Sequence, residues 1–207
     1  MPRKPDWDED SPELVTNLQE VLRHIRDKFA QRPRPDVEDA RQWHHMTMKG
    51  LKADDPSYVG AFRGEQGLED IWVEVGHLSG TDPADVATEL AAFEETLQAG
   101  VSRLDRSIRP GSEPNAAQLA EVIQLCAWAH AEWVRIHPFA NGNGRVARVW
   151  ANSIALRYGL PAFVRLRPRP GDEYARAGMH AMLGSWHPTV AVFRRLYIRH
   201  IEELDKA

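Results

Sequence analysis

The sequence predicts a mainly α-helical protein, a bundle of helices that carries one small β-hairpin. Two observations support this fold class. Apolar residues recur three or four positions apart through most of the chain, which is the spacing of one buried helix face. Residues 51–80 differ, because glycines and aspartates interrupt them and the short runs SYVGAF and IWVEV have the composition of strands. With 207 residues, 43% of them hydrophobic, the chain is long enough for one domain with a sizeable core.

Start and stop signals divide the chain into elements. Ser11 and Pro12 suit the N-cap and first position of a helix, which the prolines of QRPRP end. We expect residues 1–35 to form a polar leader, mobile over its first twelve residues, followed by this helix, and residues 36–207 to complete a single compact domain. The further helices expected are approximately 36–50, 82–100, 114–136, 143–158, 172–183 and 189–204, with Gly50, Gly100 and Gly159 as helix ends. The helix 114–136 is apolar on two faces and should be central.

Composition limits the classes of function. The net charge of -4 and the pI near 6.1 do not indicate a nucleic-acid-binding protein, since such proteins usually carry a basic face. The single cysteine, Cys126, cannot form an intrachain disulfide and is expected to be an inert buried thiol. The charged N-terminus has no apolar run, so we expect neither a signal peptide nor a membrane span, and the cytoplasm is the default compartment. A homodimer is left open.

The stretch HPFANGNGRVAR at residues 137–148 lies between the two most apolar of the expected helices. His137 has an imidazole, whose ordinary pKa near 6.5 suits a general base at neutral pH. A tight turn without chemical function is the alternative, because Asn-Gly pairs are common in turns. The second His-Pro pair, which starts at His187, lacks the glycines and arginines and serves as an internal comparison.

The residues after the histidine suit an anion. Gly142 and Gly144 permit positive φ and let the backbone approach a ligand closely. If a helix begins near Asn143, its free N–H groups and its dipole favour negative charge in the loop. Arg145 and Arg148 would then lie in the first turns, where positive charge is unfavourable unless an anion is bound. This conflict indicates a binding site for a di- or triphosphate. The histidine would deprotonate a hydroxyl, and that hydroxyl would attack a phosphate of the ligand.

HPFANGNGRVAR is similar to HPFx[D/E]GNGRxxR, the signature of the Fic (Fido) family. The segments AWAHAEWVRI before it and RVWANSIALRYGLP after it resemble the two central helices of that family, and GAFRGEQGLEDIWVEVG resembles its GxFR segment and β-hairpin flap. The likeness covers about residues 36–200 and implies a Fic-like helical bundle with a hairpin flap. The signature positions that match are His137, Pro138, Phe139, Gly142, Asn143, Gly144, Arg145 and Arg148.

The resemblance implies a protein adenylyltransferase (AMPylator), which moves AMP from ATP to a Ser, Thr or Tyr hydroxyl of a target protein. His137 would be the general base, and Arg145 and Arg148 would contact the β- and γ-phosphates. Gly144 replaces the Lys of kinase-like relatives, which favours nucleotidyl transfer. Other phosphodiester chemistry in the same loop, or a catalytically weak nucleotide-binding module, are the alternatives. The anion hole implied is Gly142, Asn143 and Gly144, and the flap that would hold the target by strand addition is Trp72, Val73 and Glu74.

One position departs from the signature. Asn141 stands where the family has an acid that holds Mg²⁺ against the phosphates. Magnesium prefers carboxylate and phosphate oxygens, and an amide oxygen supplies no charge. We therefore expect weaker metal binding and slower transfer than in a relative with the acid.

Regulation is suggested by a partial match. Many relatives are blocked by a helix with [ST]xxxE[GN], whose Glu pairs with the second arginine. Here Thr16 is followed by Glu20, and then by Val21 instead of Gly or Asn. A solvated Glu20 on an amphipathic helix is the preferred interpretation, and a separate antitoxin-like partner is then the alternative means of inhibition.

Other candidates have simpler interpretations. His44 and His45 are expected to be a pair on a helix surface, because no further ligand recurs at metal-binding spacing. His130 is expected to be a hydrogen-bonded core histidine. The basic run RLRPRP at 165–170 is interpreted as a solvated connector, with a contact to a nucleotide or partner as the alternative.

Overall fold

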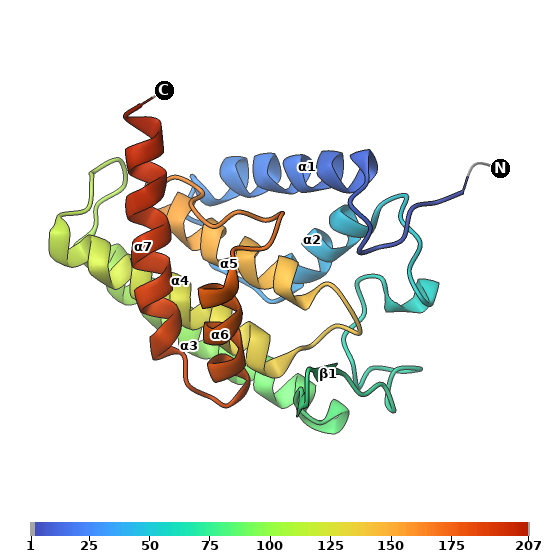
Figure 1. The fold of residues 1–207 in the computed structure, drawn as a ribbon. Coiled ribbons are helices and arrows are strands. Elements are labelled where there is room, and N and C mark those ends of the chain that lie inside the picture. Colours follow the sequence, from blue (N-terminus) through green and yellow to red (C-terminus); the bar gives the residue numbers. More distant parts are fainter. Residues whose placement is uncertain (1–2, 207) are drawn as a thin grey trace.

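The computed structural model describes residues 3–206 and confirms the mainly α-helical fold (Figure 1). Within this range the chain forms seven α-helices, two short 3-10 turns and one hairpin. In order they are α1 (Pro12–Phe29), α2 (Glu38–Met48), η1 (Pro56–Tyr58), β1 (Glu74–Val75), β2 (Leu78–Ser79), η2 (Pro83–Asp85), α3 (Val86–Ser107), α4 (Ala116–Ile136), α5 (Asn143–Arg157), α6 (Asp172–Met182) and α7 (His187–Leu204).

Helices α4 and α5 form the centre of the bundle. In Figure 1, α1 and α2 lie above α5, α3 lies below α4, and α6 and α7 lie in front of them. The core between these layers is aromatic. The ring of Trp150 on α5 lies 4.6 Å from that of Trp43 on α2 and 5.8 Å from that of Trp133 on α4. Such pairs each add about 0.5–1.5 kcal/mol beyond the burial of their area. The loop between α4 and α5 therefore connects two helices that meet in this buried aromatic core.

Local signals explain most helix ends. The Ser11 hydroxyl accepts a hydrogen bond from the amide of Leu14 at 3.1 Å, as the sequence predicted. The predicted end at Gly100 is wrong, because α3 continues to Ser107. A Cβ at Gly100 would lie 2.8 Å from Leu125, so this glycine permits close packing of α3 on α4. The same residue type thus has a packing role here instead of a terminating one.

The segment 51–80 contains fewer strands than predicted. The run SYVGAF forms a 3-10 turn and loop, because Asp55 caps Pro56–Tyr58 and its side chain accepts from the amide of Ser57 at 2.8 Å. The hairpin is confined to two-residue strands, paired antiparallel with Glu74 opposite Ser79.

The described part of the leader, which begins at residue 3, makes backbone contacts with the bundle. The amide of Lys52 donates to the carbonyl of Pro5 at 2.8 Å, and the amide of Trp7 donates to the carbonyl of Lys52 at 3.0 Å. These bonds hold residues 5–7 alongside the segment that follows α2. This part of the leader therefore packs on the bundle, and the sequence did not indicate the contact because Asp6 and Lys52 are 46 residues apart in the chain.

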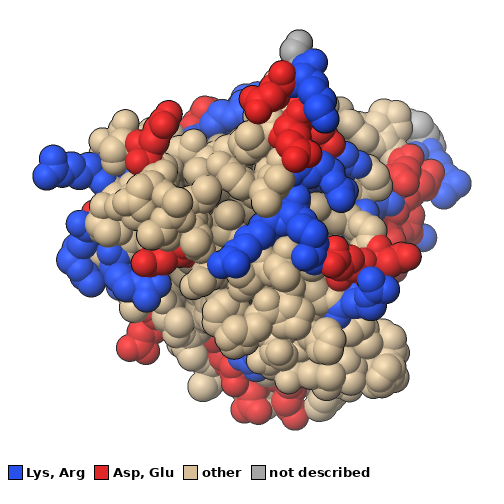
Figure 2. Space-filling model, turned by 60° about the vertical axis from the view of Figure 1, so that its left-hand side comes forward, with Lys and Arg blue, Asp and Glu red and all other residues tan. Residues whose placement is uncertain are grey.

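Surface charge is mixed on the face drawn in Figure 2, where basic and acidic side chains lie next to one another. Among the helices of residues 3–206, none has both the length and the hydrophobicity needed to cross a membrane.

Candidate active site

His137 is the residue that ends α4, and its backbone is left-handed, with φ 54° and ψ 54°. Its Nδ1–H donates to the carbonyl of Val134 at 2.9 Å, which leaves Nε2 as the nitrogen that can accept a proton. Burial lowers the pKa of His137 below its ordinary value, and the charge of Arg63 lowers it further, while the bond to Val134 opposes both. The imidazole is therefore neutral at neutral pH and suited to act as a base.

Arg63 holds the backbone around this histidine. Its guanidinium donates to the carbonyls of His137 at 2.8 Å and Ile136 at 3.0 Å, at the C-terminal end of α4. It also donates to Thr81 at 2.8 Å and Ile71 at 3.2 Å, on either side of the hairpin. One buried cation thus satisfies the last carbonyls of a helix and connects the base to the flap.

The loop after His137 is closed by Asn143. The Oδ1 of Asn143 accepts from the amide of Phe139 at 2.9 Å, and its Nδ2 donates to the carbonyl of Phe139 at 2.7 Å. The side chain of Asn143 therefore braces the loop, so only its backbone amide can contribute to an anion hole. Gly142 has φ 72° and precedes α5, as the sequence predicted. Its carbonyl accepts from Arg145 and Val146, and the first amides of a helix, here Asn143 and Gly144, have no acceptor within it.

Arg145 and Arg148 flank the glycines on the first turns of α5. A Cβ on Gly142 would lie 3.8 Å from Nη2 of Arg145, and one on Gly144 would lie 3.4 Å from Nη1 of Arg148. Arg148 donates to the carbonyl of Leu166 at 2.8 Å through Nη2. Among residues 3–206, neither guanidinium has a carboxylate within ion-pair distance. Two buried cations at the positive end of a helix, both without a counter-charge, favour an anionic ligand.

Arg145 is only 4% exposed, and burial lowers its pKa to about 10. Its Nη1 donates to the carbonyl of Trp7 at 2.7 Å, while its Nη2 is buried without a hydrogen-bond partner among the described residues. Arg145 remains charged at neutral pH, so this donor is available to an oxygen of a ligand.

Asn141 does not fit a magnesium ion. The amide of Gly60 donates to Nδ1 of His44 at 2.9 Å, so the proton of this imidazole is on Nε2. Nε2–H donates to the carbonyl and to Oδ1 of Asn141, each at 3.2 Å. The remaining side-chain atom of Asn141 is Nδ2, a donor that is buried and has no partner among the described residues. A donor nitrogen repels a cation, and the described residues contain no cluster of three or more acidic, His or Cys side chains that could hold one.

A cavity of about 760 Å³ joins the loop, the flap and the leader. Gly80 packs on the base, since a Cβ there would lie 2.9 Å from the Cβ of His137. Trp72, beside the hairpin, is 59% exposed at the edge of this cavity. The structure thus brings the predicted loop and flap residues together. Those that line the cavity are Trp72, Val73, Glu74, His137, Asn141, Gly142, Asn143, Gly144, Arg145 and Arg148.

Glu20 lies elsewhere. Its carboxylate is 3.9 Å from Nζ of Lys49, and Arg148 bonds to Leu166 and Tyr174 instead. The partial inhibitory motif therefore makes no contact with the second arginine in this structure, and the preferred interpretation of a helix-surface residue describes its position.

Two other interpretations need correction. His44 is 1% exposed and stacks on Phe139 at 4.2 Å between ring centres, so it is a support of the loop instead of half of a surface pair. Only His45 is exposed. The connector 165–170 is also not simply solvated, because Arg167 forms ion pairs with the leader. The sequence signal for these two contacts, of His44 with Asn141 and of Arg167 with Asp8, was weak, because each joins residues about a hundred or more positions apart.

The remaining interpretations agree with the structure. His130 is buried, and its Nε2 accepts from the hydroxyl of Tyr174 at 2.6 Å. Cys126 is buried, and burial raises the pKa of its thiol. His187 begins α7 and does not line the cavity, as expected of the comparison pair.

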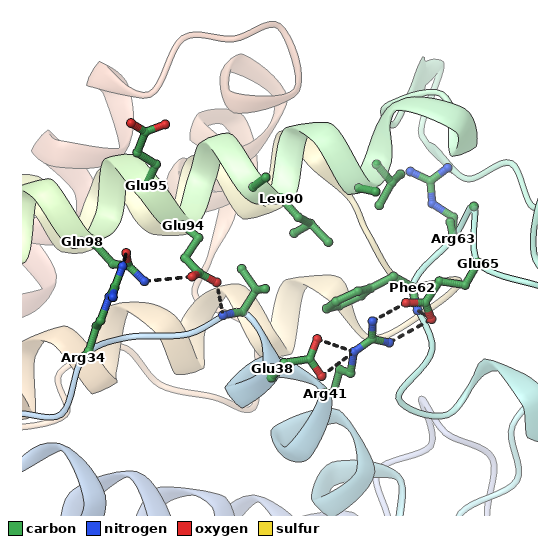
Figure 3. Close-up of a pocket in the computed structure, with 15 residues that line it drawn as sticks. Arg34, Glu38, Arg41, Phe62, Arg63, Glu65, Leu90, Glu94, Glu95 and Gln98 are labelled. Carbon is green, nitrogen blue, oxygen red and sulfur yellow. Dashed lines mark hydrogen bonds and ion pairs between the residues drawn. The ribbon is translucent and has the colours of Figure 1, made fainter.

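A second cavity, of about 490 Å³, lies between α2, α3 and the loop 60–65 (Figure 3). Several of its polar groups bond within the chain. Arg41 lies between Glu38 and Glu65 and bonds to both, while Glu94 accepts from the amide of Val37 at 3.0 Å. Arg34 donates to Gln98, and the guanidinium of Arg63 donates to backbone carbonyls.

Comparisons with known proteins agree with this geometry. The Fic/DOC family model matches residues 34–155. The protein adenylyltransferase Fic of Drosophila willistoni is 26% identical over 150 residues, which make up 72% of this chain and 25% of that protein. The relative with the same name in Drosophila grimshawi is 26% identical over 160 residues, 77% of this chain and 28% of that protein. The chain thus spans about a quarter of the length of these curated relatives.

Solved structures show the same fold. A variant of Fic-1 from C. elegans aligns with a TM-score of 0.63 and 22% identity, over 95% of this chain and 52% of that one. BepC of Bartonella tribocorum, solved with bound AMPPNP, aligns with a TM-score of 0.60 and 17% identity, over 92% of this chain and 89% of that one.

Proposed function

The chain belongs to the Fic/DOC family, and we propose that it transfers AMP from ATP to a Ser, Thr or Tyr hydroxyl of a target protein. One observation carries this proposal. The neutral imidazole of His137 ends one helix, and the first turns of the next carry two buried arginines that have no carboxylate partner among the described residues. A base and a polyphosphate site are thereby placed on one short loop.

The reaction needs little from the protein beyond positioning and charge. Nε2 of His137 takes the proton of the target hydroxyl as its oxygen attacks the α-phosphorus of ATP. The bond between the α-phosphorus and the oxygen bridging to the β-phosphate breaks, and pyrophosphate leaves. The product carries AMP in a phosphodiester bond to the side-chain oxygen. The Val134 carbonyl, which accepts from Nδ1–H, stabilises the imidazolium formed in this step.

The loop and α5 receive the phosphates. The backbone amides of Asn143 and Gly144 face the α- and β-phosphates, Arg145 contacts the β-phosphate and Arg148 the γ-phosphate. Support comes from the unpartnered Nη2 of Arg145 and the helix start at Asn143. The absence of a side chain at Gly144 leaves room for close approach and supplies no lysine of the kinase-like type.

Mg²⁺ is the metal that the family implies, but no step is assigned to it. The side-chain oxygen of Asn141 accepts from His44, and its buried Nδ2 is a hydrogen-bond donor that does not attract a cation. The arginines therefore supply the charge neutralisation that this chain's own residues offer.

Incubation with ATP labelled at the α- or the γ-phosphate tests the proposal. Label retained on protein from the α position alone indicates AMP transfer, and loss of that label in His137→Ala shows that the base is required. His187→Ala is the matched control, because it removes the other His-Pro histidine. Retention from the γ position would contradict the proposal and indicate kinase activity.

A second candidate is a nucleotide-binding module with weak or no catalysis. The commitment of Asn141 to His44 favours it, since the chain then lacks the metal-binding acid. ATP binding by calorimetry without any retained label, in a chain with intact His137, is the result that distinguishes this module from a transferase.

A further inference from the structure

The acidic leader covers the arginine end of the cavity. Arg167 donates through Nη1 to Oδ1 of Asp8 at 3.1 Å and through Nη2 to the carbonyl of Asp8 at 2.7 Å, and its Nε pairs with Asp10. The side chain of Arg167 is 23% exposed, and it lines the same cavity as Arg145 and Arg148. Two carboxylates of the leader thus line a cavity that four arginines also line, Arg145, Arg148, Arg167 and Arg169.

The leader also supplies an oxygen to Arg145. The carbonyl of Trp7 accepts from Nη1 of Arg145 at 2.7 Å, and the guanidinium carbon lies 4.9 Å from the centre of the Trp7 ring. With the oxygens of Asp8 and Asp10, this carbonyl forms a row of acceptors along two arginines. Phosphate oxygens are acceptors of the same kind, and guanidinium groups bind them in the same forked geometry.

The leader leaves one donor of this site unused. Nη2 of Arg145 has no partner among the described residues, although the side chain is more than nine-tenths buried. This nitrogen lies beside Gly142, on the side of the loop. A buried donor without an acceptor is unfavourable, so a ligand oxygen that accepted from this nitrogen would stabilise the site.

We propose that Arg167 is a third polyphosphate-binding arginine of this cavity, alongside Arg145 and Arg148, and that Asp8 and Asp10 of the leader occupy it in the nucleotide-free chain. A polyphosphate and these carboxylates carry like charges, so binding requires Arg167 to exchange one set of oxygens for the other. The exchange is within reach, because the side chains of Asp8 and Asp10 are largely exposed and their ion pairs are screened by water. The proposal deepens the function proposed above, from which it takes ATP as the ligand.

Calorimetric titration of the full chain with inorganic tripolyphosphate, ATP and AMP tests the role of Arg167. Arg167→Ala should weaken tripolyphosphate binding about tenfold, the size expected for losing charge-assisted hydrogen bonds. AMP, with a single phosphate, should be affected less. Arg165→Ala is the matched control, since Arg165 lies in the same connector, is exposed and does not line the cavity. Equal affinities in the two variants, or an equal loss for AMP, would overturn the role of Arg167. Arg167→Lys keeps the positive charge but loses the forked guanidinium, so its affinity for tripolyphosphate should lie between those of the parent and Arg167→Ala.

The role of the leader is tested by the double variant Asp8→Asn/Asp10→Asn. Removal of the competing charges should raise the affinity for tripolyphosphate about fivefold, as expected for exposed ion pairs. The double variant Asp27→Asn/Asp205→Asn changes the net charge equally at two exposed positions outside the cavity, and should have little effect. The same gain in both double variants, or no gain in the first, would overturn the occupancy by the leader. Because these readouts are binding, they remain informative even if label transfer from ATP is absent.

Discussion

Nε2 of His44 donates to Oδ1 of Asn141 at 3.2 Å. Asn141 is the position that departs from the family signature, and His44 is its hydrogen-bond partner. His44 belongs to α2 and Asn141 to the loop between α4 and α5, 97 residues apart. The same imidazole accepts from the amide of Gly60 and stacks on Phe139. One neutral histidine thus contacts the loop at Asn141 and Phe139 and connects it to Gly60.

Asn141→Asp should make label transfer from ATP faster and more dependent on Mg²⁺. One carboxylate oxygen can keep the bond to His44, and the other takes the place of Nδ2, for which residues 3–206 supply no partner. A negative oxygen there attracts the cation that the amide repels. Initial rates over a Mg²⁺ titration measure the effect, with Asn141→Ala as the control that removes the amide without adding charge. An unchanged or lower rate in Asn141→Asp would contradict this account of the position.

Much of the site could be predicted from the sequence because its signals are local. The left-handed Gly142, the start of α5 at Asn143 and the placement of Arg145 and Arg148 all lie within seven residues. The fold class followed from helical periodicity in the same way. The extent of α3 did not, because whether Gly100 ends a helix or admits Leu125 depends on the packing of a neighbouring helix.

The supports of the site could not be predicted, because each depends on a contact between distant segments. Arg63 directly follows the run SYVGAF in the GxFR segment, and only the fold brings it to the end of α4. His44 faces the core because α2 packs against the loop between α4 and α5. The leader had the composition of a mobile tail, and its contacts with the bundle are made by Lys52 and Arg167.

The pH dependence of transfer should report His137. Its pKa is lowered by burial and by Arg63, so the base stays unprotonated down to a pH below the ordinary histidine range. We expect kcat/KM to be flat through neutral pH and to fall only on further acidification, as the imidazole gains a proton. Rates from pH 5 to 8 measure the profile. A fall that is already half complete at about pH 7 would show that the environment of His137 does not lower its pKa.

Acid should destabilise the fold through His44. Burial lowers the pKa of His44 from 6.5 to about 4, so the unfolded chain binds this proton more readily than the folded one. The contribution is fully present above pH 6.5 and is lost as the pH falls toward 4, and it amounts to about 3 kcal/mol. Urea unfolding at several pH values measures the slope. His44→Gln should be less stable at neutral pH, and its free energy of unfolding should change less as the pH falls. His77→Gln, at an exposed position, should keep the pH dependence of the parent. Equal slopes in all three would contradict the assignment.

Trp72 should affect transfer to the target protein and leave the affinity for ATP unchanged. It is 59% exposed at the edge of the cavity, beside strands of only two residues. Strand addition leaves specificity to the side chains next to the added strand. Trp72→Ala should weaken transfer to a protein or peptide acceptor while ATP affinity stays the same. Leu183→Ala removes a comparably exposed apolar side chain that does not line the cavity, and it should change neither. A loss of ATP affinity in Trp72→Ala would assign this residue to the nucleotide instead.

Arg63→Lys should lower both stability and turnover. The guanidinium donates to four carbonyls, two of them at the end of α4, and lysine can keep the charge but not the forked set of bonds. Buried carbonyls without donors make this costly, and we expect a loss of about 3 kcal/mol, a fall in melting temperature of roughly 6–12 °C for a chain of this size. Because Arg63 positions the backbone of His137, kcat should fall more than the affinity for ATP. Arg103→Lys, at an exposed ion pair with Glu121, is the matched control and should stay within 0.5 kcal/mol, roughly, of the parent. If Arg63→Lys has normal stability and slow transfer, Arg63 contributes to the reaction and not to stability. If its turnover is normal, Arg63 does not position His137.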